Sequence, residues 1–119
     1  MTVPKDCNFC RENNLLKGEI IAEGTHAYLL RPESYDSSYL IIPRDHLEEL
    51  TDLPDTWWAE LKQLLPKVPD LPKNYNLSLN YGKEAGQTLA HLHFWIIPRE
   101  PGKPASGKGL ARLIREVDQ

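Results

Sequence analysis

Short hydrophobic segments separated by turn residues fill the first part of the chain, and this pattern is typical of β-strands. Residues 18–24 and 26–31 flank a turn near Gly24, a spacing that predicts a hairpin. Residues 39–42 form a continuous apolar run that stops at Pro43, as expected of a strand buried on both faces. The chain is therefore predicted to begin with strands.

Two later segments have the period of a helix. From Pro54 apolar residues recur three or four positions apart, and Asp55 in the first turn complements the helix dipole. Pro66 closes the segment, since proline cannot continue a helix. The apolar face of this helix consists of Trp57, Leu61, Leu64 and Val68. The apolar face of a second predicted helix, which follows a connection rich in Gly, Pro and Ser, consists of Leu110, Leu113, Ile114 and Val117.

Strand-like alternation is clearest in two segments joined by a glycine-containing turn. Residues 74–81 have apolar side chains on one face and polar ones on the other, and the turn should fold residues 91–99 antiparallel onto them. Alternation in the second segment puts His91, His93 and Trp95 on one face. Two imidazoles on one strand face can serve as metal ligands or as nucleophiles.

Composition and element order place the chain among ordinary globular domains. Strands with two helices, without strict alternation, indicate an α+β fold with a mainly antiparallel sheet, and 119 residues predict a single domain, 1–119. The apolar runs are too short to cross a bilayer and the first six residues lack a secretory signal, so we expect a cytoplasmic protein without membrane contact. A formal net charge of -3 argues against nonspecific nucleic-acid binding, and no specific binding is expected.

The sequence around the histidines resembles the histidine triad (HIT) superfamily of nucleotide hydrolases and transferases. The matching motifs, in the family's order, are Cys7-Asn8-Phe9-Cys10, Ile42-Pro43-Arg44-Asp45-His46, Asn80-Tyr81-Gly82 and the run from Gly86 to Arg99. Because they cover most of the chain, the resemblance implies a HIT-like fold, and by resemblance alone a homodimer. At the family's third histidine position this chain has Trp95.

Cys7 and Cys10 form a CxxC motif that, taken alone, is open to several interpretations: a redox pair, half of a zinc site, or two unrelated core thiols. A redox CxxC of the thioredoxin type follows a buried strand, and none is predicted before Cys7. The resemblance to zinc-containing HIT proteins implies that Cys7, Cys10, His46 and His91 together bind a structural Zn²⁺, since two thiolates and two imidazoles complete a tetrahedral site.

His93 is the predicted catalytic residue. An unperturbed imidazole has a pKa of about 6.5, so most of it is neutral near pH 7 and can attack phosphorus without a separate strong base. The resemblance implies attack on an α-phosphate to form a nucleotidyl-histidine. The alternative is that His93 only chelates metal beside His91, which would leave His46 unused.

Four further residues are predicted to bind substrate. The resemblance implies that Gln87 and Thr88 contact phosphate oxygens and stabilise developing charge, and that Asn80 reaches the phosphates or the sugar. Asn80 also fits the ordinary alternative of a turn-forming residue near glycine. Trp95 is expected to fill part of the pocket.

Trp95 and Arg31 are departures from the family pattern with chemical consequences. The indole has a single neutral N–H and cannot protonate a leaving group, so the chain should favour phosphoanhydrides, whose leaving group departs as an anion, over phosphoramidates. Where the family usually has an acidic residue for the ribose hydroxyls, this chain reads Tyr28-Leu29-Leu30-Arg31, and its next carboxylate is Glu33.

These residues together predict a nucleotide-binding phosphohydrolase that cleaves nucleoside polyphosphates, such as dinucleoside polyphosphates, through a covalent intermediate on His93. One alternative is a nucleotidyltransferase that uses the same chemistry with a phosphorylated acceptor. Another is a noncatalytic nucleotide-binding protein in which Trp95 marks the loss of turnover. The last is a CxxC redox protein.

Overall fold

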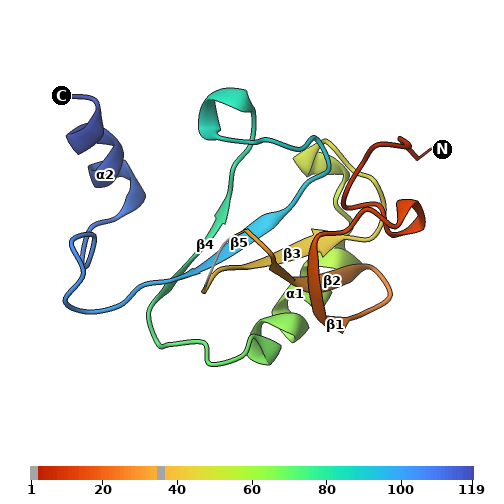
Figure 1. Ribbon diagram of the computed structural model, residues 1–119, viewed down its shortest axis with the longest axis horizontal. Helices are drawn as coiled ribbons and strands as arrows, with labels where there is room; N and C mark the ends of the chain where they lie inside the picture. Colours follow the sequence, from red (N-terminus) through yellow and green to blue (C-terminus); the bar gives the residue numbers. More distant parts are fainter. Residues whose placement is uncertain (1–2, 35–36) are drawn as a thin grey trace.

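One antiparallel sheet and two α-helices make up the fold (Figure 1). The computed structural model describes residues 3–34 and 37–119, so the first two residues used in the signal-peptide argument lie outside the described residues. The strand order is β1-β2-β3-β5-β4. The strands are β1 (Gly18–Glu23), β2 (Ala27–Pro32), β3 (Tyr39–Pro43), β4 (Tyr75–Leu79) and β5 (Phe94–Pro98). The helices are α1 (Asp55–Leu64) and α2 (Leu110–Val117). The predicted α+β fold is confirmed.

Two predicted elements are shorter in the structure than their sequence patterns. The helical pattern from Pro54 to Val68 gives an α-helix only as far as Leu64, and a 3-10 turn at Leu65–Lys67 replaces its end. Pro66 explains the change, because it has no N–H to donate to the carbonyl four residues back. The histidine segment is likewise not all strand: β5 begins at Phe94, after the histidines.

Successive side chains of the central strands point to opposite faces of the sheet and belong to two separate hydrophobic clusters. In β3, Ile41 belongs to the cluster under α1, whereas Leu40 and Ile42 belong to the other cluster. The cluster under α1 also includes Trp57, Leu61, Leu64, Leu92, Phe94 and Ile96. The opposite cluster includes Cys7, Phe9, Cys10, Tyr28 and Leu30, with Leu89 and Trp95 packed against it. The α1 helix therefore covers one face of the sheet, and the N-terminal segment with Cys7 and Cys10 covers the other.

The β4 strand lies at the edge of the sheet and is less buried than its alternation predicts. Leu77 pairs with Ile96 of β5, yet 43% of its surface is exposed. Tyr75 and Leu79 on the same face pack against the core. The alternation thus places these residues on one face but does not show how deeply each is buried, because a sequence pattern does not show that its strand has a neighbour on one side only.

The α2 helix stands apart from the sheet, at the left of Figure 1. None of its residues, all of them described, is buried. Its apolar side chains Leu110, Ile114 and Val117 are 63%, 50% and 81% exposed. The helix is present where the sequence predicts it, but its apolar face covers no core. Among the described residues, no helix is long and apolar enough to span a membrane.

Candidate functional site

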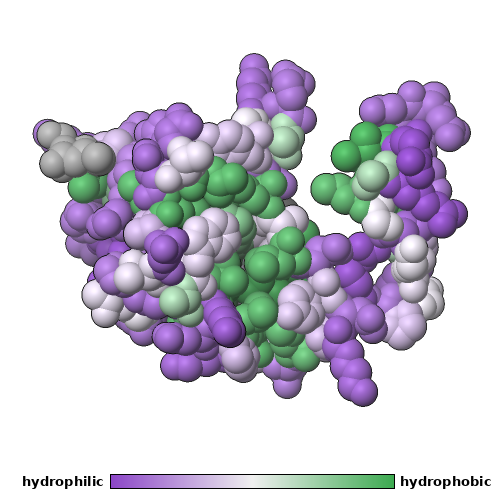
Figure 2. All heavy atoms as spheres, turned by 180° about the vertical axis from the view of Figure 1, so that it is seen from behind, coloured by the Kyte–Doolittle hydropathy of each residue, from purple (hydrophilic) through white to green (hydrophobic). Residues whose placement is uncertain are grey.

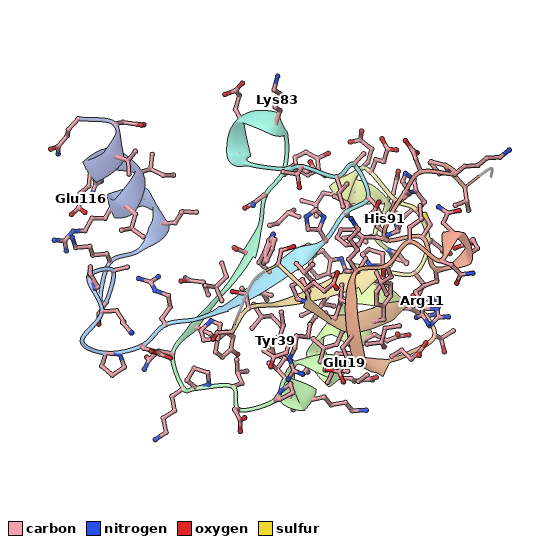
Figure 3. The ribbon with its side chains drawn as sticks, in the orientation of Figure 1. Arg11, Glu19, Tyr39, Lys83, His91 and Glu116 are labelled. Atoms are coloured by element: carbon pink, nitrogen blue, oxygen red, sulfur yellow. The ribbon has the colours of Figure 1, made fainter. Side chains whose placement is uncertain are left out.

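Four side chains that could hold a metal ion come from distant parts of the chain and meet on the face of the sheet opposite α1. They are Cys7 and Cys10 of the N-terminal segment, His46 after β3 and His91 before β5, and their candidate ligand atoms all lie within 4.8 Å of one another. Figure 3 shows His91 inside the body of the protein, whereas Lys83 and Glu116 lie at its periphery. The structure therefore brings together all the residues predicted to hold a metal.

The spacing of these atoms fits a tetrahedral metal. The Nδ1 atom of His91 lies 3.4 Å from the Cys7 Sγ and 3.5 Å from the Cys10 Sγ, and the His46 Nδ1 lies 3.3 Å from the Cys10 Sγ. A metal with bonds of about 2.3 Å to sulfur and 2.0 Å to nitrogen separates such atoms by roughly 3.5 Å at tetrahedral angles. The four side chains therefore already have the spacing that a metal needs, and the Nδ1 atom of each histidine lies close to a cysteine sulfur.

Burial of these side chains favours their uncharged forms when no metal is present. It raises the pKa of the Cys10 thiol to about 12, with the neighbouring Cys7 adding to the effect. It also lowers the pKa of His91 to about 4, although a bond to the Pro43 carbonyl opposes the shift. A bound cation would reverse the preference of the thiols, since metals bind thiolates and release their protons.

Each histidine of the cluster has a second partner that orients its ring. His91 donates from Nε2 to the Pro43 carbonyl at 2.7 Å, and the His46 Nε2 lies 2.8 Å from a carboxylate oxygen of Glu48. Because Nε2 carries the proton in both bonds, Nδ1 keeps the lone pair that a metal needs. Glu48 is a residue that the sequence analysis missed, and the His-x-Glu spacing is the signal that could have found it.

Two hydrogen bonds hold the backbone of the loop that contains the two cysteines, one from the sheet and one from the segment that follows the loop. The buried hydroxyl of Tyr28 donates to the Phe9 carbonyl at 2.6 Å, and the Asn13 side-chain amide donates to the Cys7 carbonyl at 2.9 Å. The Phe9 ring packs edge-on against His93, with ring centroids 4.9 Å apart. Phe9 thus packs against both His91 of the cluster and His93, the predicted nucleophile.

An ion-pair network ties together the two segments that carry Cys10 and His46. Glu23, at the end of β1, accepts from Arg11 at 3.2 Å and from Arg44 at 2.5 Å. The two guanidinium groups, Arg44 first, lower the pKa of the Glu23 carboxyl. One carboxylate therefore links the residue after Cys10 to the residue after Pro43.

His93 is held in one tautomer by the backbone. Its Nδ1 donates to the His91 carbonyl at 2.8 Å, which leaves the lone pair on Nε2. Burial lowers the pKa of His93, while the bond to the His91 carbonyl opposes the shift. Such an imidazole is neutral near pH 7 and oriented, the two requirements for a nitrogen nucleophile.

The predicted substrate-binding residues differ in where they lie relative to His93. Asn80 lies one position beyond the registered pair Leu79–Phe94, so the antiparallel register places it opposite His93. Trp95 faces the same side of the sheet as His93, with ring centroids 6.2 Å apart. Thr88 is exposed in the connection between β4 and β5.

Gln87 holds this connection together. Its side-chain oxygen accepts from the Gly82 amide at 2.8 Å, and its nitrogen donates to the Leu89 carbonyl at 2.9 Å and the Ala90 carbonyl at 3.2 Å. In this structure, then, the amide of Gln87 shapes the loop that leads into the histidines.

Comparisons with known proteins agree with this fold and site, which define an α+β protein whose thiol–imidazole cluster adjoins an oriented histidine. A family model described as HIT domain matches residues 34–102. The chain therefore belongs to the HIT domain family.

The similar proteins include enzymes. The chain is 32% identical to adenosine 5'-monophosphoramidase hnt1 of Schizosaccharomyces pombe, over 87% of this chain and 81% of that protein. It is 35% identical to the AP-4-A phosphorylase of Mycobacterium tuberculosis, over 85% of this chain and 60% of that protein. Among solved structures, a HIT family hydrolase from Clostridium thermocellum has a TM-score of 0.71 at 23% identity, over 86% of this chain and 97% of that one, and shows the same fold.

Proposed function

We propose that this protein is a nucleotide-binding phosphohydrolase that cleaves nucleoside polyphosphates, such as dinucleoside polyphosphates, at the α-phosphate. The observation that carries the proposal is the bond from the His93 Nδ1 to the His91 carbonyl, which presents the Nε2 lone pair of a neutral imidazole. Family membership supports a nucleotide substrate, because relatives are named for acting on adenosine 5'-monophosphoramidate and on AP-4-A.

The proposed reaction has two displacements at phosphorus. In the first, the His93 Nε2 lone pair forms a bond to the α-phosphorus, the bond to the bridging oxygen breaks, and its electron pair leaves with the remaining polyphosphate as an anion. In the second, a water oxygen attacks the phosphorus, the phosphorus–nitrogen bond breaks with its electron pair returning to Nε2, and a water proton passes to solvent. The products are a nucleoside monophosphate and the shortened polyphosphate.

Trp95 favours anhydrides within this scheme. The ring lies beside His93 but has no proton that titrates near neutral pH, so it cannot supply one to a departing amine. A polyphosphate needs no such proton because it leaves as a stable anion. We therefore expect a higher kcat/KM for dinucleoside polyphosphates than for adenosine 5'-monophosphoramidate, even though the yeast relative is named for the latter activity.

The polar residues around His93 would bind the phosphates. Asn80 lies opposite His93 by register, and Thr88 is exposed in the connecting loop. Gln87 would act through the loop that it braces, by presenting backbone N–H groups to phosphate oxygens.

The metal cluster would have a structural role with zinc. Two thiolates and two imidazoles fill the four positions of tetrahedral Zn²⁺ and leave none open for substrate. When bound, the ion supplies cross-linking of the N-terminal segment to the sheet. Cys7 and Cys10 would hold it from the segment, and His46 and His91 from the connections that follow β3 and precede β5.

Intact-mass analysis after brief exposure to adenine and guanine dinucleoside polyphosphates tests the catalytic proposal. The native protein should gain the mass of one nucleotidyl group, and His93→Ala should not. His26→Ala is the matched control, because that ring lies outside the site, 4.0 Å from Glu60. Nucleotide binding without an adduct or turnover would instead identify a noncatalytic binding protein.

A transferase is the second candidate, favoured by the similarity to a protein named AP-4-A phosphorylase. The nucleotidyl group on His93 would then pass to phosphate or a phosphorylated acceptor in place of water. Product analysis with and without inorganic phosphate separates the two: a transferase makes nucleoside diphosphate only when phosphate is added, whereas a hydrolase makes monophosphate in both cases.

A homodimer is also part of the proposal. The edge strand β4 contains no charged residue and no proline, the devices that usually prevent edge strands from pairing. Beside it, a groove of about 670 Å³ runs between the sheet edge and α2. Its apolar lining includes Leu77, Ile97, Pro98, Leu110 and Leu113, and the charged residues Arg99, Glu100 and Lys103 also line it. Figure 2 shows hydrophobic atoms on the side of α2 that faces the body across this hollow. A second copy would cover these surfaces without placing like charges opposite each other in β4.

A further inference from the structure

We propose that Glu48 is a positioning residue that sets how firmly the cluster retains its metal, by holding His46. The inference rests on the proposed metal site and adds the residue that would control it. Its basis is a single contact: the His46 Nε2 lies 2.8 Å from a Glu48 carboxylate oxygen, while the Nδ1 of the same ring lies 3.3 Å from the Cys10 Sγ.

The two imidazoles of the cluster differ in what holds them. His91 is fully buried, and its Nε2 donates to the Pro43 carbonyl, a backbone group at the end of the central strand β3. His46 follows the sheet in a connecting segment, its side chain is 10% exposed, and its outer partner is a side chain that is itself 55% exposed. His46 is therefore the imidazole more accessible to water, and the only one of the two whose outer partner a side-chain substitution can remove.

The chemistry of the contact explains the effect. A carboxylate that accepts a hydrogen bond from the Nε2–H fixes the imidazole tautomer whose lone pair is on Nδ1. It also makes Nδ1 a better electron-pair donor to a metal. Without Glu48, the Nε2–H would bond to water and the ring could rotate out of the cluster. Removal of such outer partners typically lowers metal affinity by about 10-fold to 100-fold.

Glu49 provides a matched control for this role. It is adjacent in sequence, carries the same charge and is also exposed, but it accepts a bond from the Tyr81 hydroxyl at 2.7 Å instead of bonding to the cluster. Glu48→Ala and Glu49→Ala therefore change the net charge equally, and any difference in metal affinity between them comes from the contact with His46.

Competition between the protein and a chromogenic chelator for one equivalent of Zn²⁺ tests the inference. We expect Glu48→Ala to bind Zn²⁺ about 10-fold to 100-fold more weakly than the native protein and to lose it faster. Glu49→Ala should match the native protein. Glu48→Gln, which keeps an oxygen that accepts the Nε2 proton but loses the charge, should recover part of the affinity.

Thermal unfolding of the metal-free proteins completes the test. If Glu48 acts through the metal, metal-free Glu48→Ala unfolds at the same temperature as metal-free native protein. Equal Zn²⁺ affinity for Glu48→Ala and Glu49→Ala overturns the inference while leaving the metal site intact. A native protein that binds no Zn²⁺ overturns both, and the adduct on His93 is measured independently of either result.

Discussion

The two ends of the chain lie outside the sheet, yet they are held in opposite ways. The segment before β1 has Cys7, Phe9 and Cys10 buried against the sheet, and a hydrogen bond from Tyr28 fixes its backbone. The segment after β5 ends in α2, whose residues are all at least partly exposed. Its connection is held by Arg99, which donates to the Asn76 side chain and to the Ala105 and Lys108 carbonyls.

This difference shows that an apolar pattern alone does not determine where a terminal segment packs. The N-terminal segment packs Phe9 against the sheet and brings Cys7 and Cys10 next to His46 and His91, which flank β3 and β5, so it docks on its own chain. The C-terminal segment has a regular apolar face, yet none of the residues of α2 is buried. We interpret the first as held by a metal and the second as completed by a second copy.

The largest expected effect comes from removing one ligand at the N-terminal end. Cys10→Ser should abolish stoichiometric metal binding and lower the free energy of unfolding by more than about 4 kcal/mol, the range expected when a structural metal is lost. Metal analysis and thermal unfolding measure both effects. Chelation of the native protein should reproduce the loss, and stoichiometric zinc retained by the variant would show that the ligand set is wrong.

The next effect concerns the C-terminal end. Ile114→Asp puts a charge on the exposed apolar face of α2 and should weaken association of two copies by at least about 2 kcal/mol, as at an interface hot spot. Analytical ultracentrifugation across a range of concentrations measures it. Arg115→Asp, on the opposite side of the same helix, should leave the dimer intact. A native protein that stays monomeric at all concentrations would contradict the dimer.

A smaller effect should follow from Tyr28→Phe, which removes the bond to the Phe9 carbonyl and little else. The cost should be about 1 to 3 kcal/mol, because the carbonyl loses its buried donor. Hydrogen exchange should increase in the CxxC loop and leave α2 unchanged. The control is Tyr39→Phe, whose hydroxyl accepts from Arg31 at 3.1 Å. Equal losses in both variants would mean that the Tyr28 bond has no special role in docking the N-terminal segment.

The smallest effect is expected at Glu23, which links Arg11 and Arg44. Because the network is exposed, Glu23→Gln should cost at most about 1 kcal/mol at pH 7. The two arginines hold the folded-state pKa of Glu23 below its ordinary value of 4.5, so its contribution is present above pH 4.5 and is lost as the pH falls through the folded value. The native and variant unfolding curves should therefore converge in acid.

Glu19→Gln is the control for that measurement. Glu19 is also an exposed glutamate of β1, and it pairs with Arg31 at 2.7 Å. Unlike Arg11 and Arg44, Arg31 is not within two residues of Cys10 or His46 in the sequence. Glu19→Gln should leave the metal affinity unchanged, whereas Glu23→Gln should lower it slightly. The same affinity for both variants would show that the Glu23 network does not organise the cluster.

Much of the fold could be predicted from the sequence because its strands have clear local patterns. The run at 39–42 and the alternation at 74–81 correspond to β3 and β4 within two residues at each end. The exposure of Leu77 could not be predicted, because it depends on β4 lying outside β5 in the sheet order, which is a property of the whole topology.

The site divides in the same way. Cys7, Cys10, His46 and His91 could be identified as a group because each has a motif, and the structure brings their ligand atoms together. Tyr28 and Glu23 were missed, since an exposed glutamate or a core tyrosine has no local signal that distinguishes it from ordinary surface or packing. Glu48 was missed as well, although its spacing from His46 is a local signal. Gln87 was predicted from its motif, but its hydrogen bonds within the loop depend on how the chain turns at Gly82.

His91 makes contacts in three directions: its Nδ1 faces the cysteines, its Nε2 bonds to Pro43, and its carbonyl orients His93. If the proposed metal and nucleophile are correct, a reagent that strips the metal or oxidises the thiols would thereby disturb His93 without binding at the proposed nucleotide site. Chelators and thiol oxidants should behave as slow inhibitors of turnover, and raising the substrate concentration should not relieve them.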